Sequence, residues 1–359
     1  MNVLEYDVLV VGGGPAGSSA AHQAASSGAR VLLIDRRATI GVPVQCAEFV
    51  PKLLMREVSP RARRSIVQSV DEMVTYFPGG DTSRLASPGH ILNRATFDQS
   101  LILDAVDQGA HVLSGTRAVA HSGEGVLVRR GRTELRIRAQ VIVGADGPAS
   151  TVGRWMGRRN RTFVIGVQYE VPLREPMTHT EVYFDRAYPL GYAWLFPKGD
   201  VANAGVGIAR PSAPEARAAL DRFLSNLAGR GKIGSRTILG FTSGLIPVGG
   251  PPEATVGGNI LLVGDAAGQC DPITGAGISA AVICGQMAGE AAARAVREGD
   301  PGRLLRYENE WRRLFGRSLE DARRRREHLE EHWETGNLDD VVRRSWVTAI
   351  SDCELRIAE

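Results

Sequence analysis

Apolar and polar positions follow three successive patterns along the chain, and each predicts a different kind of structure. Residues 6–13 (YDVLVVGG) form a nearly continuous apolar run, which is typical of a strand buried on both faces of a parallel sheet. A segment of small residues follows to Gly28, and residues 30–35 (RVLLID) predict a second strand. Two more buried runs lie at 141–150 and 259–265. Strands that alternate with helical segments predict an α/β fold around a parallel sheet.

The second pattern occupies the middle of the chain. Short runs of β-branched and aromatic residues, bounded by Gly, Pro or Asp, recur at 162–173, 179–186, 191–199 and 201–210. Such runs predict strands of an antiparallel sheet, and residues 66–90 are expected to join it. This sheet would form a second domain that covers a substrate.

The third pattern begins after Pro301, where the chain becomes highly charged and its apolar residues fall near helical spacing. The spacing predicts helices with one buried stripe, made of Trp311, Leu314, Phe315, Leu319, Ala322, Leu329 and Trp333. The basic run 323–326 is interpreted as the solvated face of a packing helix, and the alternatives are peripheral contact with an anionic membrane or with an acidic electron donor. Residues 272–289 are uncharged and long enough to span a bilayer. Their opening proline and four glycines instead favour a helix buried against the sheet.

Composition narrows the classes of function. The chain is 43% hydrophobic and 23% charged, as in ordinary globular proteins. Its net charge of +3 is too small to indicate a nucleic-acid partner. The four cysteines have no metal-ligand spacing, and no secretory leader is recognised. We therefore expect a cytoplasmic protein with free thiols and no metal, and we interpret the zinc-protease-like HLEEH at 328–332 as a chance match.

A glycine-rich turn follows the first strand and predicts a dinucleotide site. Gly12, Gly14 and Gly17 give the pattern G-x-G-x-x-G. In this pattern the first glycine makes a tight turn, the second lets the backbone approach a pyrophosphate, and the third lets helix and strand pack closely. Asp35 ends the second strand, where an acid can accept hydrogen bonds from ribose hydroxyls.

Three later segments favour a flavin as the nucleotide. Asp146 and Asp265 each sit at the carboxyl end of a buried run, where open α/β sheets collect ligands, and Arg94 precedes a helix-like segment. A carboxylate suits the hydroxyl-rich ribityl chain of a flavin. A glycine-rich turn into a helix, at 272–278, offers free amides that stabilise negative charge on a reduced flavin.

In this order the segments resemble FAD-binding proteins of the aromatic-hydroxylase type, in which the acid at the position of Asp35 is more often glutamate. The resemblance implies FAD and a Rossmann-like α/β FAD-binding domain over 1–65, 91–160 and 255–300. That domain is interleaved with the antiparallel-sheet substrate domain over 66–90 and 161–254 and followed by C-terminal helices over 301–359. The implied cofactor contacts are Gly12, Gly14, Ala16, Gly17, Asp35, Arg36, Cys46, Ala47, Arg94, Asp146, Asp265, Gly275, Gly277 and Ile278.

Two further segments resemble the geranylgeranyl reductase family. Residues 41–51 (GVPVQCAEFVP) place Cys46 in a loop soon after the second strand, and 188–200 (YPLGYAWLFPKGD) contain Y-x-W-x-F-P. The family often has glycine where this chain has Ala47. The resemblance implies a prenyl lipid or prenyl diphosphate substrate and an external electron donor, either NAD(P)H or a ferredoxin-like protein. In a strand, Tyr192, Trp194 and Phe196 share one face, which could line a prenyl chain or equally form a core stripe.

The chemistry of an isolated C=C bond gives Cys46 three possible roles. Hydride transfer to one carbon needs a proton for the other, because no carbonyl absorbs the negative charge. A buried thiol has a raised pKa and keeps its proton, so Cys46 is a candidate catalytic acid. It could instead position the flavin and the substrate, or act as a small buried hydrophobic residue.

The sequence therefore predicts an FAD-dependent reductase of prenyl double bonds. Two alternatives stay open at this stage. One is an FAD-dependent monooxygenase of an aromatic substrate, which uses the same FAD frame without a thiol. The other is a flavoprotein electron carrier that docks a partner and transforms no small molecule.

Overall fold

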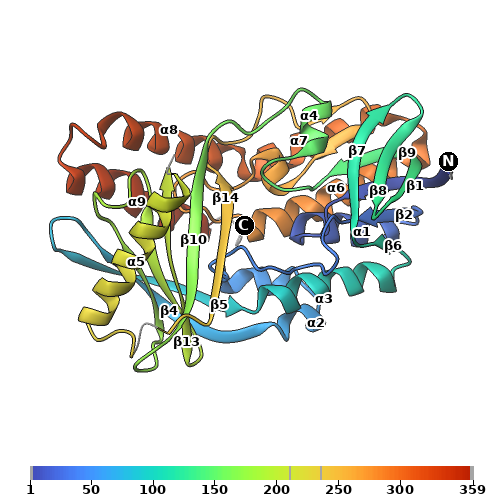
Figure 1. The fold of residues 1–359 in the computed structure, drawn as a ribbon. Coiled ribbons are helices and arrows are strands. Elements are labelled where there is room, and N and C mark those ends of the chain that lie inside the picture. The colour runs from blue at the N-terminus through green and yellow to red at the C-terminus, as the bar shows by residue number, and fades with distance from the viewer. Residues whose placement is uncertain (1–2, 210–211, 235–236, 356–359) are drawn as a thin grey trace.

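Two eight-stranded sheets lie at opposite ends of the molecule (Figure 1). The computed structural model describes residues 3–209, 212–234 and 237–355, with side chains as far as Trp346. Two sequence predictions concern parts that lie outside the described residues. They are the end of the strand predicted at 201–210, which is Arg210, and the free thiol of Cys353. None of the described helices is long and apolar enough to cross a membrane.

The first sheet carries the nucleotide-type strands, and the runs predicted at 6–13, 30–35 and 259–265 are strands in it. The central path runs in the order β15-β16-β9-β1-β2-β6, and β8 joins β7 to β9. Strand β1 pairs in parallel with both β2 and β9, as expected for buried apolar runs. The strands are β1 (Val3–Val11), β2 (Val31–Ile34), β6 (His111–Leu113), β7 (Thr116–Ser122), β8 (Gly125–Arg130), β9 (Thr133–Gly144), β15 (Val256–Gly257) and β16 (Ile260–Leu262).

The second sheet carries the middle pattern of the sequence. Its order is β14-β10-β13-β12-β11-β4-β5-β3. All neighbours are antiparallel except β11 and β4, which pair in parallel. The strands are β3 (Phe49–Pro51), β4 (Ile66–Tyr76), β5 (Thr82–Leu92), β10 (Phe163–Pro172), β11 (His179–Tyr183), β12 (Tyr192–Lys198), β13 (Val201–Ala209) and β14 (Gly240–Pro247).

Helices cover both sheets, and strand residues alternate between the two covering layers. In β1, Val8 and Val10 pack with α1 and α6, whereas Leu9 and Val11 pack toward β7 and β8. In the second sheet, Ala193 and Leu195 face α5, while Trp194 and Phe196 lie in a cluster with α8 and α9. The helices are α1 (Pro15–Ser26), α2 (Pro60–Arg63), α3 (Arg94–Asp107), α4 (Thr151–Trp155), α5 (Ala213–Gly229), α6 (Ile278–Glu298), α7 (Leu305–Trp311), α8 (Arg317–His332) and α9 (Leu338–Leu355).

The structure differs from the sequence prediction in several places, and one of them is the parallel pairing of β11 with β4 inside a sheet predicted to be antiparallel. Strand β3 lies within the range predicted for the FAD-binding domain, but it pairs with β5 in the second sheet. The uncharged run 272–289 enters its helix only at Ile278, because Gly275 has a left-handed backbone with φ 69° in the preceding turn. Helix α5 and strand β14 were not among the predicted elements, although the buried residues of α5 follow helical spacing behind a capping box at Ser212.

Two glycines let α6 lie directly against α1. A Cβ at Gly285 would be 2.5 Å from the carbonyl oxygen of Ala16, and one at Gly289 would be 2.3 Å from that of Ala20. Real Cβ atoms do not come that close to a backbone oxygen, so any larger residue forces the two helices apart. Two of the four glycines that favoured a buried helix over a membrane span thus lie in the contact between α6 and α1.

We predict that Gly285→Ala lowers the free energy of unfolding by about 1–3 kcal/mol, because the added methyl group overpacks a contact between two backbones. Gly229→Ala is the matched control, since a Cβ there meets nothing within 4 Å. Chemical denaturation of both variants gives the difference. A Gly285→Ala variant as stable as the control would show that α1 and α6 can separate without cost.

Candidate functional site

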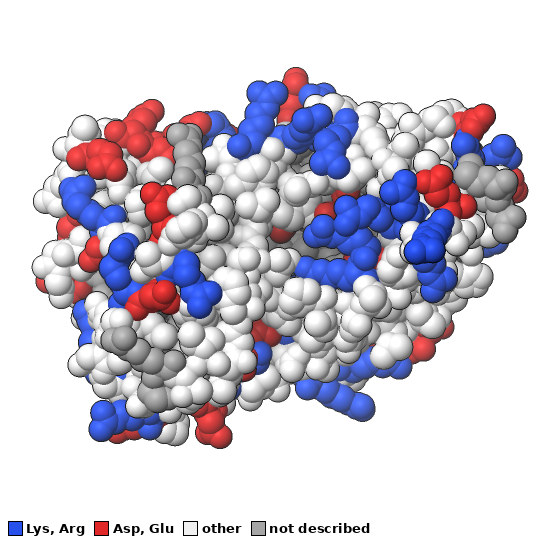
Figure 2. Space-filling model, in the orientation of Figure 1, with Lys and Arg blue, Asp and Glu red and all other residues white. Residues whose placement is uncertain are grey.

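One large cavity lies between the two halves of the molecule. Its volume is about 960 Å³, and residues of both sheets and of the C-terminal helices line it. Figure 2 shows a hollow on this face with Lys and Arg side chains gathered along one border. The arginines that line the cavity are Arg36, Arg37, Arg94, Arg117, Arg154 and Arg325.

The glycine turn forms the floor of the cavity at the N-terminus of α1. Gly12 has φ 109°, and a Cβ there would be 2.2 Å from the Ala145 oxygen, so the turn requires glycine. A Cβ at Gly17 would overlap the Gly12 oxygen, which is why Gly17 supports the turn from behind without lining the cavity. No side chain caps α1 at Gly14, and its first amides remain available to an anion.

The carboxylates of Asp35 and Asp146 accept hydrogen bonds from other groups of the protein. Asp35 accepts hydrogen bonds from the Gly13 and Arg37 amides, both at 2.7 Å, so it fixes the glycine turn as well as facing the cavity. Asp146 accepts from Ser150 at 2.5 Å and from the Thr151 amide at 2.6 Å. Its carboxylate therefore caps α4, and what Asp146 offers the cavity is mainly its backbone.

Asp265 has no such partner. Its carboxylate makes no hydrogen bond with another residue in the described part of the chain, and it lines the cavity beside the N-terminus of α6, which no side chain caps at Gly277. Burial raises the pKa of Asp265 to about 6, against the opposing charge of Arg94. A partly buried acceptor and a set of free amides thus face the same space.

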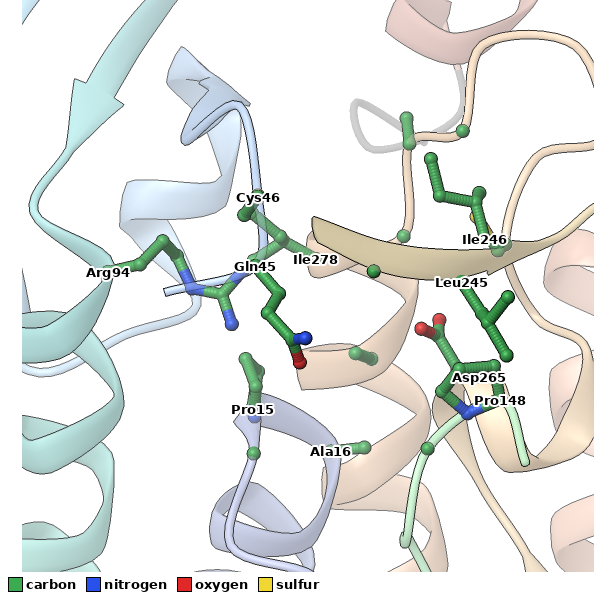
Figure 3. Close-up of a pocket in the computed structure, with 18 of the residues that line it drawn as sticks. Pro15, Ala16, Gln45, Cys46, Arg94, Pro148, Leu245, Ile246, Asp265 and Ile278 are labelled. Atoms are coloured by element: carbon green, nitrogen blue, oxygen red, sulfur yellow. The ribbon is translucent and has the colours of Figure 1, made fainter. Parts of the chain in front are cut away.

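Cys46 lies on the opposite side of the cavity from Asp265 (Figure 3). Its Sγ accepts a hydrogen bond of 3.2 Å from the Glu48 amide. Burial raises the pKa of the Cys46 thiol, while the neighbouring Arg94 guanidinium acts in the opposite direction. Arg94 is also paired with Asp98, which it contacts through two hydrogen bonds of 2.9 and 3.0 Å.

The aromatic residues of β12 form a wall of the same cavity. Tyr192, Trp194 and Phe196 all line it, on the face of the strand opposite Ala193 and Leu195. Trp346 of α9 also lines the cavity and packs against Tyr192, with ring centroids 5.1 Å apart. The Tyr192 hydroxyl donates its hydrogen bond to the Thr274 carbonyl, so its proton is directed away from the open space.

Sequence reasoning missed the side chains that hold the cysteine loop. Gln168 of β10 donates to the Cys46 carbonyl at 3.1 Å, and Asn203 of β13 donates to the Ala47 carbonyl at 3.2 Å. Glu48 is buried and binds Lys198 of β12 at 2.5 Å. Trp346 was missed as well. The sequence signal for Gln168 and Asn203 was a polar residue inside a predicted buried strand. That signal does not show that their partners are carbonyl groups of the cysteine loop.

The structure brings nearly all the predicted site residues to this cavity. Lining it are Gly12, Gly14, Ala16, Asp35, Arg36, Cys46, Ala47, Arg94, Asp146, Tyr192, Trp194, Phe196, Asp265, Gly275, Gly277 and Ile278. The residues present fit a flavin dinucleotide. Two uncapped helix N-termini suit a pyrophosphate and a flavin carbonyl, and the unpaired Asp265 carboxylate suits hydroxyl groups.

Comparisons with known proteins agree with this arrangement. Residues 7–154 match the family model for FAD dependent oxidoreductases, and residues 163–245 match that for the geranylgeranyl reductase catalytic domain. The digeranylgeranylglycerophospholipid reductase 1 of Methanopyrus kandleri is 38% identical over 346 residues, covering 91% of this chain and 92% of the relative. The reductase of the same name from Methanococcus aeolicus is 34% identical and covers 88% and 84%.

A solved structure is similar over almost the whole chain. It is a geranylgeranyl bacteriochlorophyll reductase-like protein from Thermoplasma acidophilum, with a TM-score of 0.87 and 29% identity. The match covers 98% of this chain and 96% of that protein. The likeness therefore extends through the C-terminal helices that close the cavity.

We predict that FAD affinity falls as the pH drops below about 6, because Asp265, with its pKa raised to about 6, is then protonated and loses the charge that strengthens its hydrogen bonds. Asp265→Asn should remove this pH dependence. Asp265→Ala should weaken binding by about 1.5–3 kcal/mol, the contribution of a charged hydrogen bond. Titration of the apoprotein with FAD, followed by flavin fluorescence between pH 5 and 8, measures both effects. A wild-type affinity that stays flat across this range would contradict the assignment.

Proposed function

The chain belongs to the geranylgeranyl reductase family of FAD-dependent oxidoreductases, and on that premise we propose that it saturates isolated C=C bonds in the geranylgeranyl chains of a prenylated glycerophospholipid. One observation carries the proposal. The cofactor cradle, the Cys46 thiol and the aromatic wall of β12 all open into a single cavity. An apolar wall beside a hydride donor and a protonated acid is what reduction of an unactivated alkene requires.

The residues divide the chemistry between them. Reduced FAD, when bound, supplies a hydride from N5 to one alkene carbon. Cys46 gives its S–H proton to the other carbon as the hydride is transferred, so that no free carbanion forms, and the products are a saturated bond and a thiolate. The Arg94 guanidinium lies beside that thiolate and stabilises its negative charge. It therefore lowers the free-energy cost of proton transfer from Cys46. Tyr192, Trp194 and Phe196 hold the chain and exclude water.

Two partners are proposed beyond the lipid. An external donor, NAD(P)H or a ferredoxin-like protein, must reduce the flavin, and the arginines along the cavity border suit either an anionic nucleotide or an acidic protein. A lipid substrate also implies peripheral contact with a membrane. Stopped-flow reduction with each donor at low and high salt tests the first point.

Chemically reduced enzyme, mixed without oxygen with a geranylgeranyl glycerophospholipid, should reoxidise as the lipid gains two hydrogens per bond. Flavin absorbance and mass spectrometry of the lipid follow the two halves of this reaction. Reoxidation only by oxygen would indicate a monooxygenase. Reoxidation only by a partner protein would indicate an electron carrier.

We predict that Cys46→Ser slows single-turnover alkene reduction by about 10²–10⁴, the usual cost of losing a positioned general acid, while FAD binding and flavin reduction remain intact. Cys284→Ala is the matched control, because Cys284 is a fully buried thiol on α6 outside the cavity. A Cys46→Ser rate within about threefold of wild type, well under that range, would remove Cys46 from the mechanism.

We predict that Trp346→Leu shifts the preference toward longer prenyl chains, because the indole of Trp346 lines the cavity beside Tyr192 and a smaller side chain leaves room for more of the prenyl chain. The ratio of kcat/KM for a C25 over a C20 chain should rise by about 10-fold or more, since even one methylene in an apolar pocket is worth ~10–200-fold. Trp333→Leu is the control, as Trp333 packs in the same cluster without lining the cavity. Equal ratios in the two variants would place the end of the chain elsewhere.

A further inference from the structure

The loop that carries Cys46 is held by four strands of the second sheet. Thr242 of β14 donates to the Val44 carbonyl at 2.5 Å, and the Gln45 side chain donates back to the Ser243 carbonyl of β14. The next loop residues meet β10, β13 and β12 in turn, through Gln168, Asn203 and Lys198. The sheet order is β14-β10-β13-β12. The loop therefore crosses the sheet strand by strand, and Glu48 is its last anchor.

Glu48 has a left-handed backbone, a buried side chain and a hydrogen-bonded carboxylate. Its backbone is left-handed, with φ 72°, a conformation that residues other than glycine rarely adopt. Its side chain is 1% exposed. Its carboxylate accepts hydrogen bonds from the Arg94 amide at 2.8 Å, from Lys198 at 2.5 Å and from Asn203 at 2.9 Å. Strained positions persist where the surroundings determine them, and here the partners come from both halves of the molecule.

The strained backbone of Glu48 points its N–H at the sulfur of Cys46, at 3.2 Å. That hydrogen bond and the Arg94 guanidinium both favour a thiolate, whereas the Glu48 carboxylate favours the thiol. The titratable groups that act on Cys46 are thus Glu48 from its own loop and Arg94 from α3, and Tyr192 of β12 also interacts with it. Asp98 faces Arg94 from the same helix.

We propose that Glu48 is a positioning residue for the proton donor: its amide fixes the direction of the Cys46 thiol, and its carboxylate offsets the charge of Arg94 so that the thiol enters the reaction protonated. The proposal rests on the proposed function. The task is additional to the anchoring of the loop, which the same carboxylate provides through the Arg94 amide, Lys198 and Asn203.

The test begins without any prenyl substrate. In FAD-loaded protein, the rate at which iodoacetamide alkylates Cys46 is followed against pH by mass spectrometry of the Cys46 peptide, which separates it from the other cysteines. Glu48→Gln keeps the amide and removes the charge. The midpoint pH should fall by about one unit, equivalent to about 10-fold faster alkylation near neutral pH. Glu48→Asp, which restores the charge, should restore the midpoint.

Single-turnover reduction of a prenyl chain gives the second measurement. Glu48→Gln should slow it by on the order of 10²-fold at unchanged FAD content, since small displacements of a reacting group have effects of this size. Glu170→Gln is the matched control, because Glu170 also contacts Lys198, at 3.4 Å, but is partly exposed and does not touch the loop. The control should leave the midpoint pH unchanged and the rate within about twofold of wild type, far from the 10²-fold effect.

Asn203→Ala is a second variant, which provides a test if Glu48→Gln does not fold. It removes bonds to the loop without changing a charge, so the rate should fall while the alkylation midpoint stays constant. The proposal is overturned if a folded Glu48→Gln has the wild-type midpoint, or if Asn203→Ala retains the full rate. If wild-type enzyme reduces no prenyl chain, the proposed function fails, and the alkylation data still decide whether Glu48 controls the thiol.

Discussion

The arrangement of the molecule depends on one loop that belongs to the first half by sequence and to the second half by its contacts. Residues 44–48 leave the nucleotide-type sheet and are held by hydrogen bonds from β14, β10, β13 and β12. Because these bonds cross the gap between the halves, the cavity and the position of the thiol are fixed together. A displacement of the second sheet would move Cys46 relative to the glycine cradle. The two sheets are therefore one catalytic unit, although their strands are interleaved along the chain.

The structure of the cofactor half is determined by another constraint. Polar backbone groups must come close to a ligand inside an apolar core. This half meets the constraint with glycines and uncapped helix ends instead of charged side chains. Gly12 turns the chain with a left-handed backbone, and the amides of α1 and α6 meet at the cavity. Helix dipoles and amides carry partial charges that need no counterion, so the cradle can attract an anion without burying a cation beside it. Of the arginines that line the cavity, Arg94 is paired with Asp98 of the same helix.

Much of this could be predicted from the sequence, because the signals are local. Buried strands, the glycine turn and the alternating face of Tyr192, Trp194 and Phe196 each depend on spacing within ten or so residues. The anchoring of the cysteine loop could not be predicted. Glu48 is 150 positions from Lys198 and 155 from Asn203, and no spacing rule links them. The parallel pairing of β11 with β4 was missed for the same reason. Asp146 shows that a local signal can also mislead. Its position at the end of a strand favoured a ligand contact, but its carboxylate accepts a hydrogen bond from the first amide of α4.

The late position of Trp346 has a consequence for how the protein is made. The aromatic face that includes Phe196 is covered by α8 and α9, and Trp346 follows Phe196 by 150 positions in the chain. At roughly 5–20 residues per second, a ribosome needs about 8–30 s to bridge that interval. During this time the nascent chain exposes an apolar surface that its own later helices will bury. Translational pauses before α8 would prolong this exposure.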